Sequence, residues 1–389
     1  MNVKTRSGKY VKSTTTGESF LAFIPKPLPP DPPLELTNSD LDLLEKANRA
    51  LGRLDGMTSL LPDVGLLIYS YIRKEALLSS QIEGTQSSLA DLLLYEIDEA
   101  PGVPMEDVEE VSCYVSALNY GLTRLREGFP LSLRLLREIH GVLLSSGRGS
   151  GKAPGEFRRS QNWIGGSRPG NARFVPPPPE AMTDCLSSWE KFLHDDPVRT
   201  PVLIKAARAH VQFETIHPFL DGNGRLGRLL ITLLLCAEGA LSEPTLYLSL
   251  YLKSHRDSYY DLLDRVRTEG DWEEWIRFFL RGVLTTAEQA VEAARAMLKL
   301  FEDDQHKIGE LGRAAPSALR VHELMRKSPL LTIPHAVTKL GLSTPTVTSA
   351  LKNLEKLGLV RELTQRSRNR MFAYEGYLRI LSRDTEPIR

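Results

Sequence analysis

Residues 217–228 read His-Pro-Phe-Leu-Asp-Gly-Asn-Gly-Arg-Leu-Gly-Arg and bring together the residue types that polyphosphate chemistry requires. His217 is a candidate general base, because the ordinary pKa of histidine lies near neutrality. Asp221 is a candidate ligand for a hard divalent cation. Gly222 and Gly224 lack a Cβ, so backbone N–H groups beside them can approach an anion closely. The stretch therefore predicts a site that binds a polyphosphate and a metal ion and moves one proton.

Two predicted helices must hold this stretch. Residues 201–216 carry apolar side chains at helical spacing, and residues 226–237 form a second, very apolar helical run. The loop between them would lie at the N-terminus of the second helix, where free N–H groups and the macrodipole favour an anion. Arg225 and Arg228 are three residues apart on its first turn, so both guanidinium groups can face that anion.

The stretch resembles the signature of Fic-domain proteins, His-x-Phe-x-Asp/Glu-Gly-Asn-Gly-Arg-x-x-Arg, and matches every defined position. The resemblance implies a protein adenylyltransferase, which moves AMP from ATP to a Ser, Thr or Tyr hydroxyl of a target protein and releases pyrophosphate. It implies that His217 is the base and that Asp221 holds Mg²⁺ between the α- and β-phosphates. Arg225 would contact the β-phosphate and Arg228 the γ-phosphate. The other ATP-binding positions of the motif would be Gly222, Asn223, Gly224 and Gly227. The sequence lacks a P-loop and the kinase signature set, which makes γ-phosphoryl transfer the weaker interpretation.

Residues 79–84, Ser-Ser-Gln-Ile-Glu-Gly, resemble the inhibitory pattern of this family, Ser/Thr-x-x-x-Glu-Gly/Asn, at Ser79, Glu83 and Gly84. The resemblance implies that Glu83 pairs with Arg228. A carboxylate there would occupy the guanidinium group that the γ-phosphate needs and would repel the phosphate. Alternatively, Glu83 only caps or solvates a helix end. His217 and Glu83 could also support removal of AMP from a modified target, with Glu83 orienting a water.

Residues 157–178 contain two short apolar runs around a turn rich in Gly, Ser, Pro and Asn, which predicts a hairpin. The hairpin resembles the Fic flap, which holds an extended target segment by main-chain pairing. Ile164 and Gly165 would then lie nearest the nucleotide. Residues 247–263 resemble the segment that borders the adenine pocket, and Tyr260 is the candidate for adenine contact. The alternatives are a plain surface hairpin and a core tyrosine.

The chain of 389 residues is long enough for two or three domains, and its 49 basic residues equal its 49 acidic ones. We expect a mainly α fold in three parts: residues 1–62 (a proline-rich arm at 25–33 and a helix at 36–55), a Fic core at 63–300, and a linker with a winged helix–turn–helix at 301–389. The inhibitory helix would span about 63–84. Three cysteines without paired spacing predict a reducing compartment. No apolar stretch is long enough to span a membrane, so we expect a soluble cytoplasmic protein. A homodimer is implied by the resemblance alone.

Residues 311–389 carry 14 Lys and Arg against 6 Asp and Glu, a net charge of +8. Helices at 317–327, 333–340 and 344–357 and strands at 360–362 and 371–374 resemble a winged helix of bacterial regulators. The third helix would enter a DNA major groove, and the wing arginines would contact phosphates. The candidate DNA contacts are Thr344, Thr346, Ser349, Lys352, Arg366, Arg368 and Arg370. The unit could instead mediate protein contacts or dimerisation. A DNA-binding regulator whose Fic core senses ATP or switches assembly is therefore the alternative function.

Overall fold

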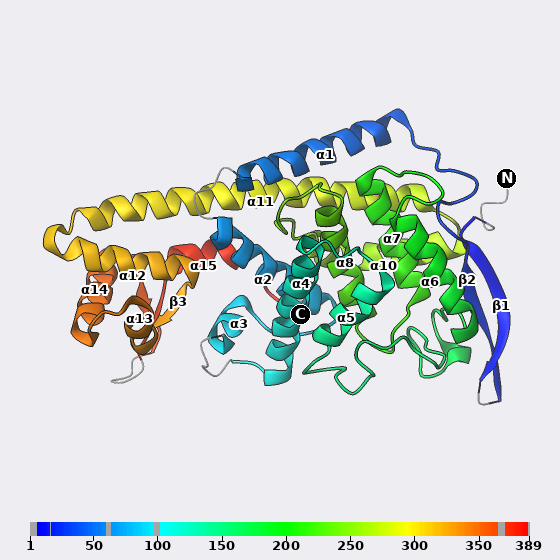
Figure 1. Ribbon diagram of the computed structural model, residues 1–389, viewed down its shortest axis with the longest axis horizontal. Coiled ribbons are helices and arrows are strands. Elements are labelled where there is room, and N and C mark those ends of the chain that lie inside the picture. The colour runs from blue at the N-terminus through cyan, green and yellow to red at the C-terminus, as the bar shows by residue number, and fades with distance from the viewer. Residues whose placement is uncertain (1–5, 16, 60–63, 97–101, 365–369, 388–389) are drawn as a thin grey trace.

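The computed structural model describes residues 6–15, 17–59, 64–96, 102–364 and 370–387. The molecule is mainly helical, as expected. Figure 1 shows that it is elongated and that one long helix runs from the large helical body to a small C-terminal unit. Within the described ranges, β-structure is limited to two small antiparallel sheets and an isolated bridge. No helix among these residues is long and apolar enough to cross a membrane.

The helical body surrounds α7 and α8, the two helices that flank residues 217–222. Residues 203–216 of α7 are buried on all sides, because α7 lies at the centre of the body. Two indole N–H groups donate to its carbonyls, from Trp189 to Ala209 and from Trp275 to Ala207, each at 2.9 Å. The helices of the body are α2 (Val64–Ile82), α3 (Leu89–Tyr95), α4 (Met105–Arg126), α5 (Leu133–Leu143), α6 (Pro179–Leu193), α7 (Val202–Ile216), α8 (Asn223–Ala237), α9 (Ser249–Ser254) and α10 (Arg256–Thr268).

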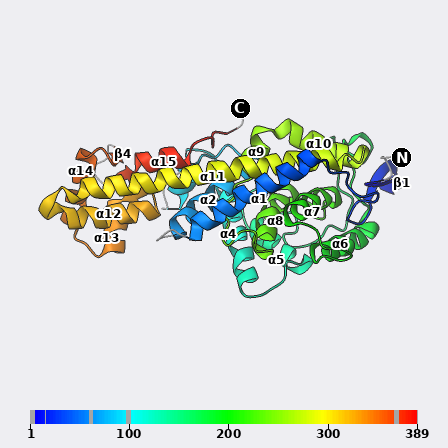
Figure 2. The same cartoon turned by 90° about the horizontal axis from the view of Figure 1, so that it is seen from above.

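The long helix α11 (Trp272–Gly309) is 38 residues long. Asp271 caps its N-terminus, because the Asp271 side chain accepts a hydrogen bond from the Glu274 amide at 3.3 Å. The helix α1 (Asn38–Ser59) lies along α11, as two views show (Figures 1 and 2). An ion pair of 2.7 Å from Arg277 to the buried Asp40 fixes the start of α1 on this helix. The helix predicted at 36–55 is thus confirmed.

The N-terminal residues form a hairpin that the sequence did not indicate. Strand β1 (Gly8–Thr15) pairs antiparallel with β2 (Glu18–Pro25), in a register that places Gly8 opposite Pro25. One side of β2 packs against Val175, and the Phe23 amide donates to the Val175 carbonyl at 2.9 Å. The predicted extended arm begins only where this hairpin ends.

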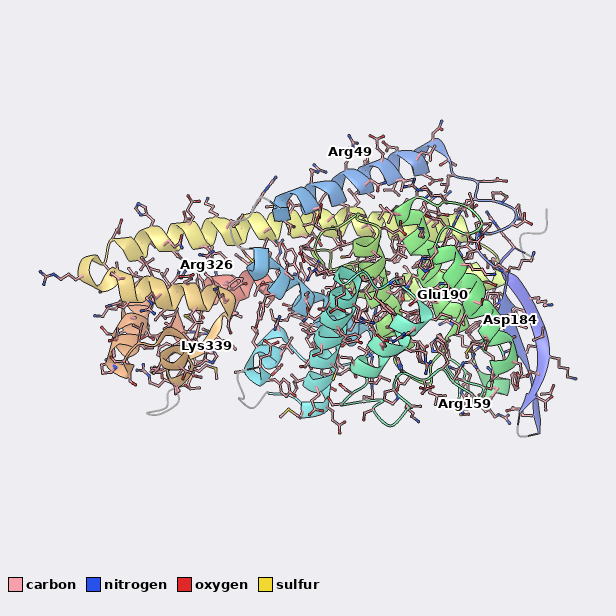
Figure 3. The ribbon with its side chains drawn as sticks, viewed as in Figure 1. Arg49, Arg159, Asp184, Glu190, Arg326 and Lys339 are labelled. Atoms are coloured by element: carbon pink, nitrogen blue, oxygen red, sulfur yellow. The ribbon has the colours of Figure 1, made fainter. Side chains whose placement is uncertain are left out.

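The C-terminal unit contains the helices and strands predicted for it, in the predicted order. It consists of η3 (Gly312–Ala314), α12 (Ala315–Lys327), β3 (Leu330–Thr332), α13 (Ile333–Leu340), α14 (Thr344–Lys356), β4 (Arg361–Glu362), β5 (Met371–Ala373) and α15 (Glu375–Leu381). Strand β5 lies between β3 and β4, and both pairings are antiparallel. Figure 3 labels Arg326 and Lys339 on this unit. The strand β3 and the helix α15 were not predicted from the sequence. The assignment of this unit as a winged helix stays a prediction.

The chain behind α15 returns to the helical body and lies against α2. Lys74 Nζ donates to the Arg383 carbonyl at 2.8 Å, and Gln81 Nε2 donates to the Thr385 carbonyl at 2.9 Å and to the Ser87 carbonyl at 2.9 Å. Gln81 and Thr385 are both buried. The last turn of α2 is therefore tied to a segment 304 residues further along the chain.

A buried hydrogen-bond chain joins α11 to the C-terminal unit. The Tyr374 hydroxyl donates to Asp304 Oδ2 at 2.6 Å, so it is left to accept from His322 Nε2 at 3.1 Å.

Tyr374→Phe should lower the free energy of unfolding by about 1–3 kcal/mol, because a buried carboxylate and an imidazole each lose a partner. Urea titration measures the loss. The exposed Tyr10→Phe is the control and should change stability by less than about 0.5 kcal/mol. Equal effects of the two changes would contradict this role of Tyr374.

Candidate active site

His217 ends α7 in the left-handed backbone region, with φ 49° and ψ 62°. This conformation turns the chain out of the helix and places the imidazole at the edge of a cavity. Its backbone carbonyl accepts hydrogen bonds from Arg158 Nε at 2.9 Å and from Asn162 Nδ2 at 3.2 Å. Arg158 is buried, so this brace is shielded from water. The strained turn is therefore held from the segment that was predicted to form the flap.

The loop after His217 is closed by the side chain of Asn223. Its Oδ1 accepts from the Phe219 amide at 2.9 Å, and its Nδ2 donates to the Phe219 carbonyl at 2.8 Å. The Asn223 side chain thus shapes the loop, and its predicted part in ATP binding stays a prediction. The helix α8 begins at Asn223 itself, so the amides of its first turn remain at the N-terminus, as predicted.

His140 on α5 is a second brace that the sequence did not indicate. The Gly155 amide donates to His140 Nδ1 at 2.8 Å, so the proton of the neutral ring lies on Nε2. Nε2 then donates to the Asp221 carbonyl at 3.0 Å. The ring stacks on Phe219 with its centroid at 3.8 Å, and burial keeps the pKa of His140 below its ordinary value. A neutral histidine thus connects Gly155 to the Asp221 end of the loop.

Asp221 stands beside the N-terminus of α8 with its side chain 35% exposed. Its Oδ1 accepts from the Gly222 amide at 2.6 Å and lies 3.5 Å from Arg225 Nη2. The described residues contain no cluster of three metal-ligating side chains. A single accessible carboxylate fits Mg²⁺, which commonly binds through one or two carboxylates together with substrate phosphates.

Arg228 is buried, with 2% of its surface exposed, and pairs with Glu83 across the body. Its Nη2 lies 2.7 Å from Glu83 Oε1, and its Nε donates to Ser79 Oγ at 2.8 Å. Burial acts to raise the pKa of Glu83, but the charge and hydrogen bond of Arg228 outweigh it, so this pKa lies below its ordinary value. A Cβ at position 224 would lie 2.3 Å from Glu83 Oε1, so Gly224 leaves the room that the carboxylate occupies. Gly84, the residue after Glu83, has a φ of +102°, a backbone conformation that favours glycine.

Arg225 faces a different carboxylate from the one beside Arg228. Its Nη1 lies 3.3 Å from Oε1 of Glu110 on α4, and both side chains are buried. Arg148 reaches the other oxygen of Glu110 at 3.2 Å. Arg225 and Arg228 were both predicted to face one anion. Glu110 was not predicted as part of the site, because nothing in the sequence around Glu110 marks it.

A cavity of about 350 Å³ brings together seven of the predicted site residues: Glu83, Ile164, Gly165, His217, Gly224, Arg228 and Tyr260. The remaining lining residues were not anticipated, and they are Trp163, Arg173, Phe174, Glu214, Tyr259, Leu263, Asp264 and Arg267. Ser79 contacts Arg228 from behind, and Gly227 packs against α7. Asp221, Gly222, Asn223 and Arg225 lie in the adjoining loop and first turn rather than in the cavity lining.

The predicted flap is a looser structure than a hairpin. Its two runs meet in one antiparallel bridge, in which Ile164 and Phe174 exchange hydrogen bonds of 2.8 and 3.1 Å. A short turn, η2 (Pro169–Asn171), lies between them. The ion pair from Arg168 to Glu18, at 3.3 Å, connects this turn to β2. Prolines 176–179 prevent a longer ladder, because proline lacks the N–H that pairing needs.

The electrostatics of the cavity favour a neutral His217. Burial, followed by the charges of Arg267 and Arg158, lowers the pKa of His217 to about 3. Its Nδ1 lies 3.4 Å from the Glu214 carbonyl. At neutral pH the imidazole is therefore neutral, so one of its ring nitrogens has a lone pair that can accept a proton.

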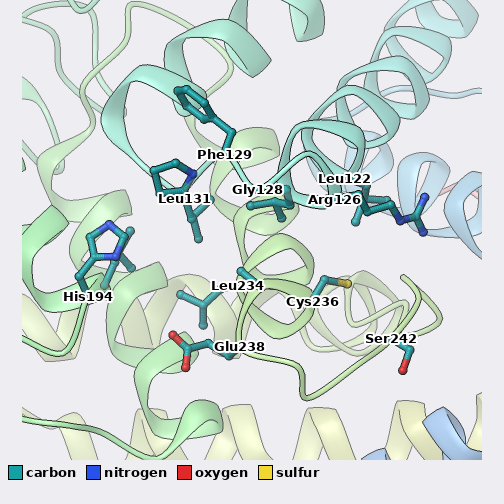
Figure 4. A pocket seen from close by; sticks show the side chains of 14 residues that line it. Leu122, Arg126, Gly128, Phe129, Leu131, His194, Leu234, Cys236, Glu238 and Ser242 are labelled. Atoms are coloured by element: carbon teal, nitrogen blue, oxygen red, sulfur yellow. The ribbon is translucent and has the colours of Figure 1, made fainter.

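A second cavity, of about 390 Å³, lies between the end of α4 and the end of α8 (Figure 4). Its lining includes Phe129, Leu131, Leu234, Cys236 and Glu238. It contains no residue of the 217–228 stretch. The first cavity is therefore the candidate active site.

The structure describes five of the seven candidate DNA contacts, and three of them are exposed. Thr344, Ser349 and Lys352 are exposed on α14, and Thr346 is half-buried. Arg370 pairs with Glu362 of β4, and its predicted phosphate contact stays a prediction. Arg366 and Arg368 lie outside the described residues.

Comparison with known proteins agrees with this geometry. Residues 41–123 match the Fic/DOC family N-terminal model, and residues 130–235 match the Fic/DOC family model. The chain carries a Fic domain. The protein adenylyltransferase Fic of Culex quinquefasciatus is 34% identical over 206 residues, which cover 51% of this chain and 37% of that protein. The protein of the same name from Aedes aegypti is 33% identical over 201 residues. The chain thus spans little more than a third of the length of these relatives.

Solved structures with this fold are also known. A Fic family protein from Desulfovibrio desulfuricans matches with a TM-score of 0.57 at 19% identity and covers 88% of this chain and 97% of that one. A Fic domain containing signaling protein from Bacteroides thetaiotaomicron matches with a TM-score of 0.52 over 65% of this chain. At these identities the likeness shows the Fic fold alone.

Removal of Glu83 should turn the Arg228 pocket into an anion site. In Glu83→Ala, pyrophosphate should raise the melting temperature more than it does in the unaltered protein, because the buried guanidinium lacks its carboxylate. Binding at one hundred times Kd adds about 2.7 kcal/mol of stability. Differential scanning fluorimetry measures the shift. Glu127→Ala, at an exposed helix end, is the control, and an equal pyrophosphate response in both variants would contradict the assignment.

Proposed function

We propose that this protein is an autoinhibited protein adenylyltransferase, which transfers AMP from ATP to a Ser, Thr or Tyr hydroxyl of a target protein. The observation that carries the proposal is the pairing of Glu83 with Arg228 in the cavity that also contains His217. The names of the relatives and the intact 217–228 stretch support the same chemistry.

The transfer follows from the positions of these groups. A target hydroxyl beside His217 gives its proton to the imidazole while its oxygen attacks the α-phosphorus. The bond from that phosphorus to the bridging oxygen breaks, and pyrophosphate leaves. Arg228 and the amides at the start of α8 would stabilise the leaving charge. Asp221 would hold Mg²⁺, which supplies further neutralisation of the phosphates when bound.

Inhibition arises because Glu83 and the nucleotide need the same guanidinium group. With Glu83 in place, Arg228 is already neutralised, and a negative oxygen faces the incoming phosphate. The same carboxylate could orient a water toward an AMP-modified target, so removal of AMP is the reverse activity to test in parallel.

Glu83→Gly should raise transfer of label from α-³²P-ATP with Mg²⁺, to the protein itself or to target proteins in a lysate, because it frees Arg228. The double change Glu83→Gly with His217→Ala should abolish the transfer while ATP still binds, because the base is lost. A positioned general base contributes about 10²–10⁴-fold to the rate. Gel autoradiography measures transfer, and titration calorimetry measures ATP binding.

Two controls make this experiment decisive. Glu127→Gly removes an exposed carboxylate elsewhere and should leave labelling unchanged. ATP labelled at the γ-phosphate should give no labelled protein, because that phosphate leaves with pyrophosphate. Label from the γ-position would identify phosphoryl transfer and refute the proposal, as would unchanged labelling in Glu83→Gly.

A DNA-binding regulator is the second candidate, favoured by the exposed Thr344, Ser349 and Lys352 on one helix of a basic unit. Lys352→Glu should weaken binding to duplex DNA and reduce the salt dependence of that binding by about one counterion. Fluorescence anisotropy at several salt concentrations measures both. Lys46→Glu on α1, with equal change in net charge, is the control. No loss of affinity in Lys352→Glu relative to Lys46→Glu would exclude this face.

A further inference from the structure

Glu214 is a carboxyl group of the cavity to which the proposed reaction assigns no role. It lies on α7, one turn before His217, and its side chain is 8% exposed. Its Oε2 lies 4.0 Å from His217 Nδ1, and among the described residues its Oε1 has no hydrogen-bond partner. A buried carboxyl oxygen without a partner costs stability, so its retention here needs an explanation.

The site for this carboxyl group is built by the 217–228 stretch itself. A Cβ on Gly227 would lie 2.3 Å from Glu214 Oε1, so only a glycine leaves room for the oxygen. His210, also on α7, lies 2.9 Å from the Gly227 carbonyl and holds α8 close to α7 at this level. The carboxyl group is therefore confined between the two helices, next to the ring of His217.

The chemistry at His217 requires a group in this place. When Nε2 accepts the proton of a target hydroxyl, the ring becomes a cation with an N–H at Nδ1. Burial and the nearby guanidinium groups of Arg267 and Arg158 oppose that cation. The Glu214 carbonyl, 3.4 Å from Nδ1, offers only a weak neutral acceptor. A carboxylate would stabilise the charge more strongly.

We propose that Glu214 is a positioning residue for His217, whose carboxylate accepts the Nδ1–H and stabilises the imidazolium formed during transfer. The proton from the target hydroxyl stays on Nε2, and the Nδ1 proton stays on the ring. This inference rests on the proposed transferase function. It needs the two groups to close from 4.0 Å to hydrogen-bond distance, a small rotation of either side chain.

The charged and titratable groups around Glu214 define its pH range. Burial raises the pKa of Glu214 to about 7, against the opposing charge of Arg228, with Glu83 raising it further and Arg267 lowering it. The hydroxyls of Tyr259 and Tyr260 and the ring of His217 also line this cavity, and His217 stays neutral above a pKa of about 3. The carboxylate required by the proposal is therefore present above, and lost below, a pH near 7. In a protein without Glu83 this limit moves lower.

The kinetic test compares Glu83→Gly with Glu83→Gly/Glu214→Gln, which has nearly the same shape. We expect kcat for AMP transfer to fall at least about tenfold, within the range for an oriented base, and ATP affinity to change less than about twofold. At each pH, kcat/KM of Glu83→Gly is divided by kcat/KM of the double variant, so that the titration of ATP cancels. This ratio should rise with pH through the Glu214 pKa and then level. An unchanged kcat, or a loss of ATP affinity equal to the loss of kcat, would overturn the proposal.

A second measurement does not depend on catalysis. With ¹⁵N-labelled histidine, the ring resonances of His217, identified by their absence in His217→Ala, should shift between about pH 6 and 8 in the unaltered protein as Glu214 ionises. The shift should vanish in Glu214→Gln. If Glu83→Gly shows no AMP transfer, the proposed function fails, and this titration alone decides whether Glu214 contacts His217. A His217 resonance that does not respond to Glu214 would refute the contact.

Discussion

The buried charge of Arg228 is the constraint on which the site depends. A guanidinium group with 2% of its surface exposed requires an opposite charge, and Glu83 supplies it from a position 145 residues earlier in the chain. This pairing connects the end of α2 to α8, and in the proposed function it would also occupy the place of a phosphate. Stability and the proposed inhibition would then have the same physical source. Any ligand that displaces Glu83 must bring negative charge of its own to the same guanidinium group.

The rest of the body keeps the reacting groups rigid. The loop after His217 contains few residues, but each of its ends is fixed by a buried partner: Arg158 at the His217 carbonyl, Asn223 at Phe219, and His140 at the Asp221 carbonyl. These partners come from the flap segment, from α8 and from α5. A loop fixed from three sides needs little reorganisation when a charged substrate arrives, which is the condition for electrostatic catalysis.

Several residues that the cavity brings together could be predicted from the sequence because they lie close together in the chain. His217, Gly224 and Arg228 lie within one continuous stretch, and the helices on either side have clear apolar periodicity. The partners of these residues could not be predicted, because pairs such as Arg225 with Glu110 depend on how α4 packs against α8. The N-terminal hairpin escaped prediction for a similar reason. Its strands are stabilised by contact with Val175, more than a hundred residues away, rather than by a strong pattern of their own.

The hydrogen bonds from Gln81 to Thr385 and from Lys74 to Arg383 have a practical consequence for handling the protein. Gln81 stands two residues before Glu83, so the backbone that presents the proposed inhibitory carboxylate is anchored by the chain behind α15. A protease cut before Arg383 during purification would remove the acceptors of two buried side chains of α2, Lys74 and Gln81. Basal activity measured on such a preparation would then report on the handling of its C-terminal residues as much as on its active site.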